Sequence, residues 1–288
     1  MTDNRIEEFL PGKDKIVVAH VLSRFLTSTK NGTSRGSCCG EVRVKLKTLR
    51  ILVVCVSIVM NHPELAVPAQ VLPVETFEDS ALYAFPAQWS VRGDTEAAHT
   101  IYHVMAEGNN QFLHADANQQ AIQIGLVRRF SPHEFPVVRW CWRVLQLPPN
   151  GDESRKETHD SAAGVYIIFD NTLFPRILKY VWSTTLPVGT RVTNPLYWRA
   201  KIIVLANGKA GLGEWHRETV NVYADYKALF GAEPGAVQGI GVASSSSFTK
   251  SRVIADYDDF QLLSTEAWRT DNTPAVVTLE PPRATHGR

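Results

Sequence analysis

The segment from residue 137 to residue 183 constrains the fold most, because it holds three apolar stretches separated by polar turns. The first covers residues 137–145. The second, residues 164–169, is β-branched and aromatic, which is typical of a strand covered on both faces. The third, residues 177–183, alternates between large and small or polar side chains. Together these stretches predict three strands at the centre of a sheet, and the rest of the chain must supply the partner layer.

The first stretch also predicts which side chains enter the core. In an extended backbone successive side chains point to opposite faces, so Trp140, Trp142 and Val144 share one face. Cys141 lies between the two tryptophans, and we expect it to be an inert core residue rather than a nucleophile.

Strand patterns dominate the chain from Val71 onwards. Many short apolar runs alternate with turn signals at separations near ten residues, such as Asn207-Gly208. The one helix that the pattern predicts is short, residues 224–230, and stops at Gly231. We therefore predict an all-β protein: an antiparallel β-sandwich or jelly roll over residues 70–264 with one short helix.

The N-terminal region predicts export. Arg43, Lys45, Lys47 and Arg50 precede an apolar run over residues 51–60 that is too short to span a bilayer, and Val67-Pro68-Ala69 offers a cleavage site. We expect residues 43–69 to be a signal peptide and the protein to be periplasmic or secreted. A buried strand or helix in this region is the alternative.

The ends of the chain complete the predicted organisation. Residues 1–42 do not resemble part of a signal peptide, so we expect a disordered leader or a start codon assigned too far upstream. Residues 265–288 are polar and contain proline, which predicts a flexible C-terminal tail. We expect no transmembrane span in the mature chain.

Charge and cysteine content narrow the function classes. The formal net charge is only +1, so the composition gives no electrostatic indication of nucleic-acid binding. Cleavage after Ala69 would leave Cys141 as the only cysteine. A chain with one thiol forms no internal disulfide, so a large apolar core has to stabilise it.

Five patterned segments resemble a bacterial family of exported proteins, catalogued as domain-of-unknown-function family 3047. The segments are residues 139–144, Asp160 with residues 165–169, residues 179–183, residues 225–231 and residues 255–260. The resemblance covers Val71 to Leu263 and implies a periplasmic or secreted concanavalin-like or jelly-roll sandwich. It implies no activity. Where relatives are expected to be rich in Asp and Thr, this chain has Ser244–Ser247, which puts any cation site built on that segment in doubt.

Acidic residues form one candidate site near the end of the last predicted strand. Asp256 and Asp258 share a face, and Asp259 follows. These carboxylates can hold a structural Ca²⁺, which takes six to eight oxygen ligands. They can also act as an acid/base pair in glycan cleavage. The alternative is that they cap turns or face water.

Asp160 is a second acidic candidate. It follows His159, but adjacent strand residues point to opposite faces, so the two do not easily form a catalytic pair. We expect a structural role, with Arg143 or Arg139 as the partner of Asp160, and we also include it among the candidate ligand-binding residues.

Aromatic residues beside loops form the candidate sugar-binding set. Flat aromatic faces stack on the C–H surfaces of sugar rings, and their polar tips bond hydroxyl groups. Trp182, Tyr197, Trp198 and Trp215 lie beside predicted loops. Packing in the core is the alternative role for each of them.

These features predict an extracytoplasmic, non-catalytic binding module for carbohydrate or cell-envelope glycan. One alternative is a polysaccharide hydrolase or lyase with Asp256, Asp258 or Asp160 as acid/base groups. Another is a structural envelope protein that binds a second protein, indicated if the four aromatic residues are buried.

Overall fold

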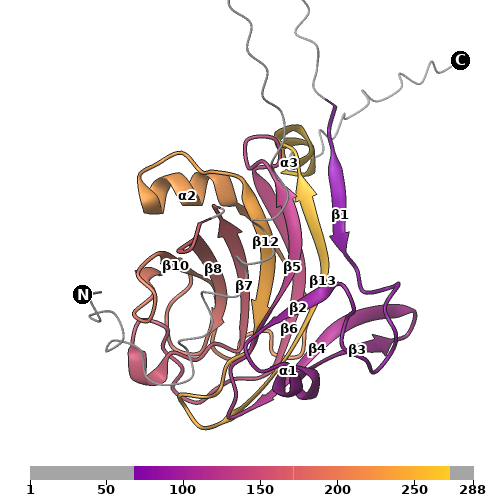
Figure 1. Ribbon diagram of the computed structural model, residues 1–288, viewed down its shortest axis with the longest axis vertical. Helices are drawn as coiled ribbons and strands as arrows, with labels where there is room; N and C mark the ends of the chain where they lie inside the picture. Colours follow the sequence, from indigo (N-terminus) through magenta and orange to yellow (C-terminus); the bar gives the residue numbers. More distant parts are fainter. Residues whose placement is uncertain (1–67, 171, 273–288) are drawn as a thin grey trace, which may run out of the picture.

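Two stacked β-sheets form the body of the protein in the computed structural model, which describes residues 68–170 and 172–272 (Figure 1). The six-stranded sheet has the order β11-β6-β13-β4-β3, and β1 also pairs with β13. Its strands are β1 (Val71–Glu75), β3 (Tyr102–Glu107), β4 (Asn110–Asn118), β6 (Val137–Gln146), β11 (His216–Asn221) and β13 (Arg252–Leu263).

The second sheet has seven strands in the order β2-β5-β12-β7-β8-β10-β9. Its strands are β2 (Trp89–Arg92), β5 (Gln123–Phe130), β7 (Ala163–Phe169), β8 (Arg176–Ser183), β9 (Arg191–Thr193), β10 (Ala200–Asn207) and β12 (Val237–Ala243). Strands β8 and β10 pair in parallel, and the other pairs are antiparallel. The predicted antiparallel β-sandwich is therefore confirmed.

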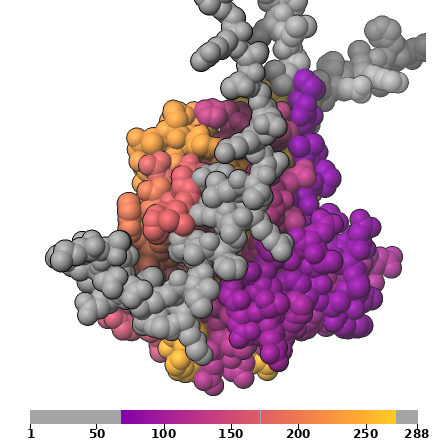
Figure 2. Space-filling view, in the orientation of Figure 1, coloured from indigo at the N-terminus to yellow at the C-terminus, as the bar shows by residue number. Residues whose placement is uncertain are grey.

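Within the described residues, three α-helices lie at the margins of the sandwich: α1 (Thr95–Ile101), α2 (Val222–Phe230) and α3 (Thr265–Asn272). A 3₁₀ helix occupies residues 156–158. Helix α2 is the predicted helix: the Asn221 side chain accepts from the Ala224 amide at its start, and Gly231 ends it with φ 64°. Figure 2 shows α2, in orange, and the N-terminal strands, in indigo, on opposite sides of the view.

Helices α1 and α3 differ from the expectation of one helix. The first eight residues of the expected tail form α3. Its Ala267 is buried against Val137 and Leu263, at the ends of β6 and β13. This tertiary contact orders a segment whose composition alone indicates no structure.

Some expectations fall on residues outside the described ranges. These are the leader over residues 1–42, the signal segment up to residue 67, and the tail from residue 273 onwards. Within the described ranges, no helix is long and apolar enough to cross a membrane.

The three apolar stretches that were expected to pair in one sheet are divided between the two sheets. Strand β6 belongs to the six-stranded sheet, whereas β7 and β8 pair in the other. The ring centroids of Trp140 and Tyr180 lie 5.7 Å apart, and those of Trp142 and Trp182 lie 6.2 Å apart. Strands β6 and β8 therefore face each other across the core, which periodicity alone does not distinguish from pairing.

Two buried tyrosine hydroxyls also connect the layers. The Tyr257 hydroxyl on β13 accepts from the Gly164 amide on β7 and bonds the Ser244 hydroxyl at 3.0 Å. The Tyr102 hydroxyl on β3 donates to the Ile122 carbonyl and accepts from the Ser244 amide. Both phenol hydroxyls have hydrogen-bond partners, and a buried hydroxyl without a partner would lower the stability of the fold. These bonds therefore fix one sheet relative to the other.

We predict that truncating one interlayer aromatic destabilises the protein strongly. Trp140→Ala should lower the free energy of unfolding by about 3–5 kcal/mol, because it leaves a large cavity in the core. Chemical denaturation followed by circular dichroism measures this loss.

The matched control for this test is Trp198→Ala, because Trp198 is 70% exposed. Its effect should stay within about 0.5 kcal/mol. Equal effects of the two substitutions would contradict an interior organised by the Trp140 contacts.

Candidate functional site

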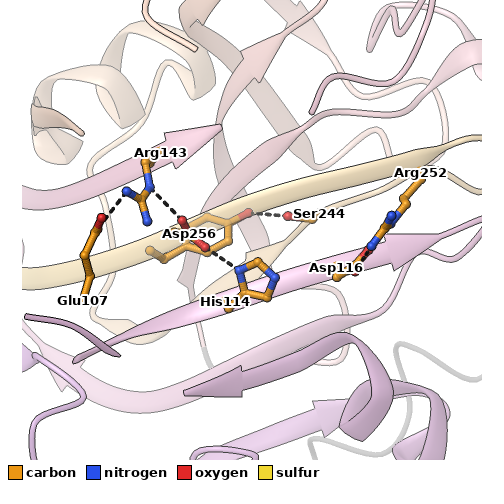
Figure 3. Close-up of polar contacts among 8 residues, drawn as sticks. Glu107, His114, Asp116, Arg143, Ser244, Arg252 and Asp256 are labelled. Carbon is orange, nitrogen blue, oxygen red and sulfur yellow. Dashed lines mark hydrogen bonds and ion pairs between the residues drawn. The ribbon is translucent and has the colours of Figure 1, made fainter. Parts of the chain in front are cut away.

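The predicted carboxylates lie on the outer face of the six-stranded sheet. Ala255 and Tyr257 of β13 point into the core, so Asp256 and Asp258 point outward. Asp256 accepts from Arg143 Nε at 2.8 Å, and its other oxygen bonds His114 Nδ1 at 2.6 Å (Figure 3). Both oxygens of this buried carboxylate are therefore occupied by partners from the neighbouring strands.

The partners of Asp256 extend this network across the face (Figure 3). Arg143 also pairs with Glu107 at 2.9 Å. Its guanidinium lies 4.7 Å from the centroid of the Trp215 ring, which holds it by cation–π attraction. His103 lies beside His114, and burial together with this neighbour lowers the pKa of His103.

Asp258 and Asp259 do not join Asp256 around a common point. Asp258 accepts from Asn110 Nδ2 at 2.8 Å and from the Asp259 amide at 2.7 Å. Burial raises the pKa of Asp258 to about 6. Asp259 adopts φ 53°, where the pairing of β13 with β6 shifts register. No group of three or more metal-ligating side chains occurs in the described part of the chain, so we assign no cation site to these residues.

Asp160 fixes the serine-rich segment and does not bind an arginine as expected. One oxygen accepts from the Ser245 hydroxyl at 2.5 Å, and the other accepts from the amide and hydroxyl of Thr249. Arg143 bonds Asp256, and Arg139 pairs with Asp271 instead. Asp160 is fully buried, so its contacts are those of a structural residue.

The four candidate aromatic residues separate into three environments. Trp182 is fully buried in the interlayer core. Trp215 packs on Arg143 at the six-stranded sheet. Tyr197 and Trp198 lie in the loop before β10, where Trp198 is exposed and stacks with Arg199 at 5.3 Å. Of the four residues, the structure therefore brings only Tyr197 and Trp198 together.

Cys141 also differs from its expected place. It lies on the outer face of the six-stranded sheet, half-buried, and its sulfur is 4.0 Å from an Asp259 oxygen. Burial raises the pKa of the thiol. Cys141 is therefore disfavoured as a nucleophile, as expected, although it does not belong to the core.

The outer face of the seven-stranded sheet contains residues that sequence reasoning missed. Gly125, Gly241, Tyr166 and Lys179 stand in register across the neighbouring strands β5, β12, β7 and β8. They point outward because their strand neighbours, such as Tyr180, point into the core. The face therefore combines glycines on two strands with an aromatic ring and a cation on the next two.

Tyr166 and Lys179 pack closely over a third glycine. A Cβ atom on Gly164 would lie 3.3 Å from Lys179 Cε and 3.4 Å from Tyr166 Cε2. A Cβ atom on Gly241 would lie 2.7 Å from the amide nitrogen of Gln123. The Lys179 ammonium lies 5.4 Å from the centroid of the Tyr166 ring. Glycine at these positions lets the longer side chains lie flat along the sheet.

Basic and phenolic groups gather beside this row. Burial lowers the pKa of Arg92, and the nearby hydroxyls of Tyr197 and Tyr166 act in the opposite direction. Burial raises the pKa of Tyr197, which Arg199 and Arg92 partly counter. The guanidinium of Arg92 therefore lies near the hydroxyl groups of both Tyr166 and Tyr197.

A buried acidic loop lies near the Lys179 end of the row. The Ser183 hydroxyl donates to Glu153 Oε2 at 2.6 Å, and burial raises the pKa of Glu153. Burial and the nearby Lys179 lower the pKa of His159 to about 3, so its imidazole is neutral at neutral pH. Its Nδ1 bonds the Glu153 carbonyl at 2.8 Å.

One sequence signal could have located this face. Gly239-Ile240-Gly241 places two glycines on one side of a strand, which indicates close approach of another group to the backbone. Tyr166 and Lys179 have no such signal, because they come together only through the pairing of β7 with β8.

Comparison with known proteins identifies one family and several structures. The family model described as protein of unknown function (DUF3047) matches residues 87–261. No curated protein matches the sequence.

Solved structures with some likeness have low sequence identity. One is the family 30 carbohydrate-binding module of cellulosomal cellulase Cel9D-Cel44B of Clostridium thermocellum, with 10% identity, TM-score 0.38, and 68% of this chain and 99% of that chain covered. A cellulase derived from Cel12A of Rhodothermus marinus has 11% identity and a TM-score of 0.37, with 68% of this chain and 100% of that chain covered. The Emp47p carbohydrate recognition domain has 12% identity and a TM-score of 0.35, with 69% of this chain and 98% of that chain covered.

We predict that Asp256 contributes much more stability than a surface carboxylate on the same face. Asp256→Asn should cost about 3–5 kcal/mol of unfolding free energy, because it leaves the largely buried guanidinium of Arg143 without its buried counter-charge. Urea denaturation at neutral pH measures the change.

Asp116→Asn is the matched control. Asp116 pairs with Arg252, whose side chain is half-exposed. Its loss should cost no more than about 1 kcal/mol. An Asp256 variant as stable as this control would show that the buried network contributes nothing.

Proposed function

This chain belongs to the family described as protein of unknown function (DUF3047), and we propose that it is an exported, non-catalytic module that binds a carbohydrate. The binding surface in this proposal is the outer face of the seven-stranded sheet. Export is proposed from the basic and apolar segment over residues 43–69.

The observation that carries this proposal is the row of Gly125, Gly241, Tyr166 and Lys179. A sugar ring offers C–H surfaces to an aromatic face and hydroxyl groups to polar tips. The half-buried Tyr166 supplies the aromatic face, and Gly125, which has no side chain within 4 Å of its Cβ position, lets a ring approach the backbone. Tyr197 and the exposed Trp198 supply further aromatic surface in the loop before β10.

The burial and the hydrogen bonds of the candidate catalytic acids support a binding role rather than catalysis. Asp160, Asp256 and Asp258 are buried, and each already accepts hydrogen bonds on both carboxylate oxygens. A general acid or base must reach the proton that it transfers. None of these three carboxylates has an oxygen free for a polymer at the surface.

We predict that two substitutions on this face remove carbohydrate binding. Tyr166→Ala should weaken binding by about 2 kcal/mol, the cost of truncating an aromatic anchor. Gly125→Leu should block the face without strain, because the nearest atom to an added Cβ is 3.6 Å away. Calorimetric titration of the full chain, after screening a glycan panel, measures both.

Trp215→Ala provides the matched control, because Trp215 packs against Arg143 and Phe112 at the other sheet. It should leave the affinity unchanged. Binding that is lost in Trp215→Ala and retained in Tyr166→Ala would move the site to the six-stranded sheet. Failure of the wild-type chain to bind any glycan would refute the proposal.

A further inference from the structure

Lys179 is a buried cation whose ammonium makes no hydrogen bond within the described part of the chain. The residue is 2% exposed, and its ammonium faces the ring of Tyr166. Among the described residues, no carboxylate or other hydrogen-bond acceptor lies within bonding distance of Nζ. A buried ammonium is costly unless its charge and its three donors are met. A ligand that carries a hydrogen-bond acceptor can therefore bind to this ammonium.

The nearest acidic residue is poorly suited to neutralise Lys179. Burial raises the pKa of Glu153, and the nearby charge of Lys179 only partly counters this effect. One of its oxygens accepts from Ser183, and the other is buried without a partner. Burial thus disfavours the charged form of this carboxyl group beside Lys179.

The two sheets differ sharply in charge. The seven strands of the larger sheet contain no aspartate or glutamate. Their basic residues are Arg92, Arg128, Arg129, Arg176, Lys179, Arg191 and Lys201. The smaller sheet carries both signs: its acidic residues are Glu75, Glu107, Asp116, Glu218, Asp256, Asp258 and Asp259, and its arginines are Arg139, Arg143, Arg217 and Arg252. Three of the basic residues of the larger sheet, Arg176, Arg191 and Lys201, contact helix α2. The strands that form the face proposed to bind sugar therefore contribute Lys179 to it and no carboxylate.

We infer that the carbohydrate bound on this face is acidic, and that Lys179 receives its anionic group beside the Tyr166 ring. This inference rests on the proposed function. A carboxylate of a uronic acid and a sulfate ester share the required chemistry, since each brings a negative charge and several acceptor oxygens.

The test compares acidic polysaccharides with their neutralised forms, using the full chain. Polygalacturonate and alginate are each paired with the carboxyl-reduced polymer, and heparin is paired with its desulfated form. Each acidic polymer that binds should do so about 10- to 100-fold more tightly than its neutralised form, as for loss of a charged hydrogen bond. The polymer class that binds separates carboxylate from sulfate recognition.

Lys179→Met assigns the preference to this residue. It should abolish the difference between acidic and neutralised polymers, whereas Lys209→Met, at an exposed turn position, should preserve it. If Lys179→Met fails to fold, the salt dependence of wild-type binding serves instead. Affinity for the acidic polymer should fall as salt is raised, and affinity for a neutral polymer should not.

Equal affinity for acidic and neutralised polymers would overturn the inference and leave carbohydrate binding intact. A preference for the acidic form that survives in Lys179→Met would overturn the role of Lys179. Absence of binding to every polymer would instead refute the proposed function on which the inference rests.

Discussion

The contact between large aromatic side chains across the two sheets is the interaction on which the rest of the structure depends. Trp140 and Trp142 on β6 meet Tyr180 and Trp182 on β8, and all four are fully buried. The single cysteine among the described residues is free, so no disulfide assists them there. Apolar burial of this size is the dominant favourable term in folding. It also fixes, by alternation, which residues of each strand face outward.

The outward residues give the two sheets different surfaces. On the six-stranded sheet, charges are paired among themselves, as Asp256 is with Arg143 and His114. On the seven-stranded sheet, glycines lower the surface beside Tyr166, and Lys179 remains without a close acceptor. A network of paired charges stabilises the fold. A cation that lies beside an aromatic ring without a hydrogen-bond acceptor can instead bind a ligand. The difference between the faces is the physical basis for placing recognition on the larger sheet.

Periodicity predicted the local structure well because it reflects burial directly. The inward face of β6, the antiparallel sandwich and the end of α2 at Gly231 all follow from residue patterns. The grouping of strands into sheets did not follow, since facing strands and paired strands have the same alternation. For that reason the sequence indicated Trp182 as a binding residue and gave no indication of Lys179. Asp160 was assigned an arginine partner for the same reason: its serine and threonine partners come from a distant loop.

The most direct test of this account is a heteronuclear NMR titration of the protein with an acidic oligosaccharide. The account predicts chemical-shift changes at the amides of Gly125 and Gly241 and along β7 and β8, with β4 and β13 unaffected. Shift changes centred on β4 and β13, around Asp256 and His114, would contradict it.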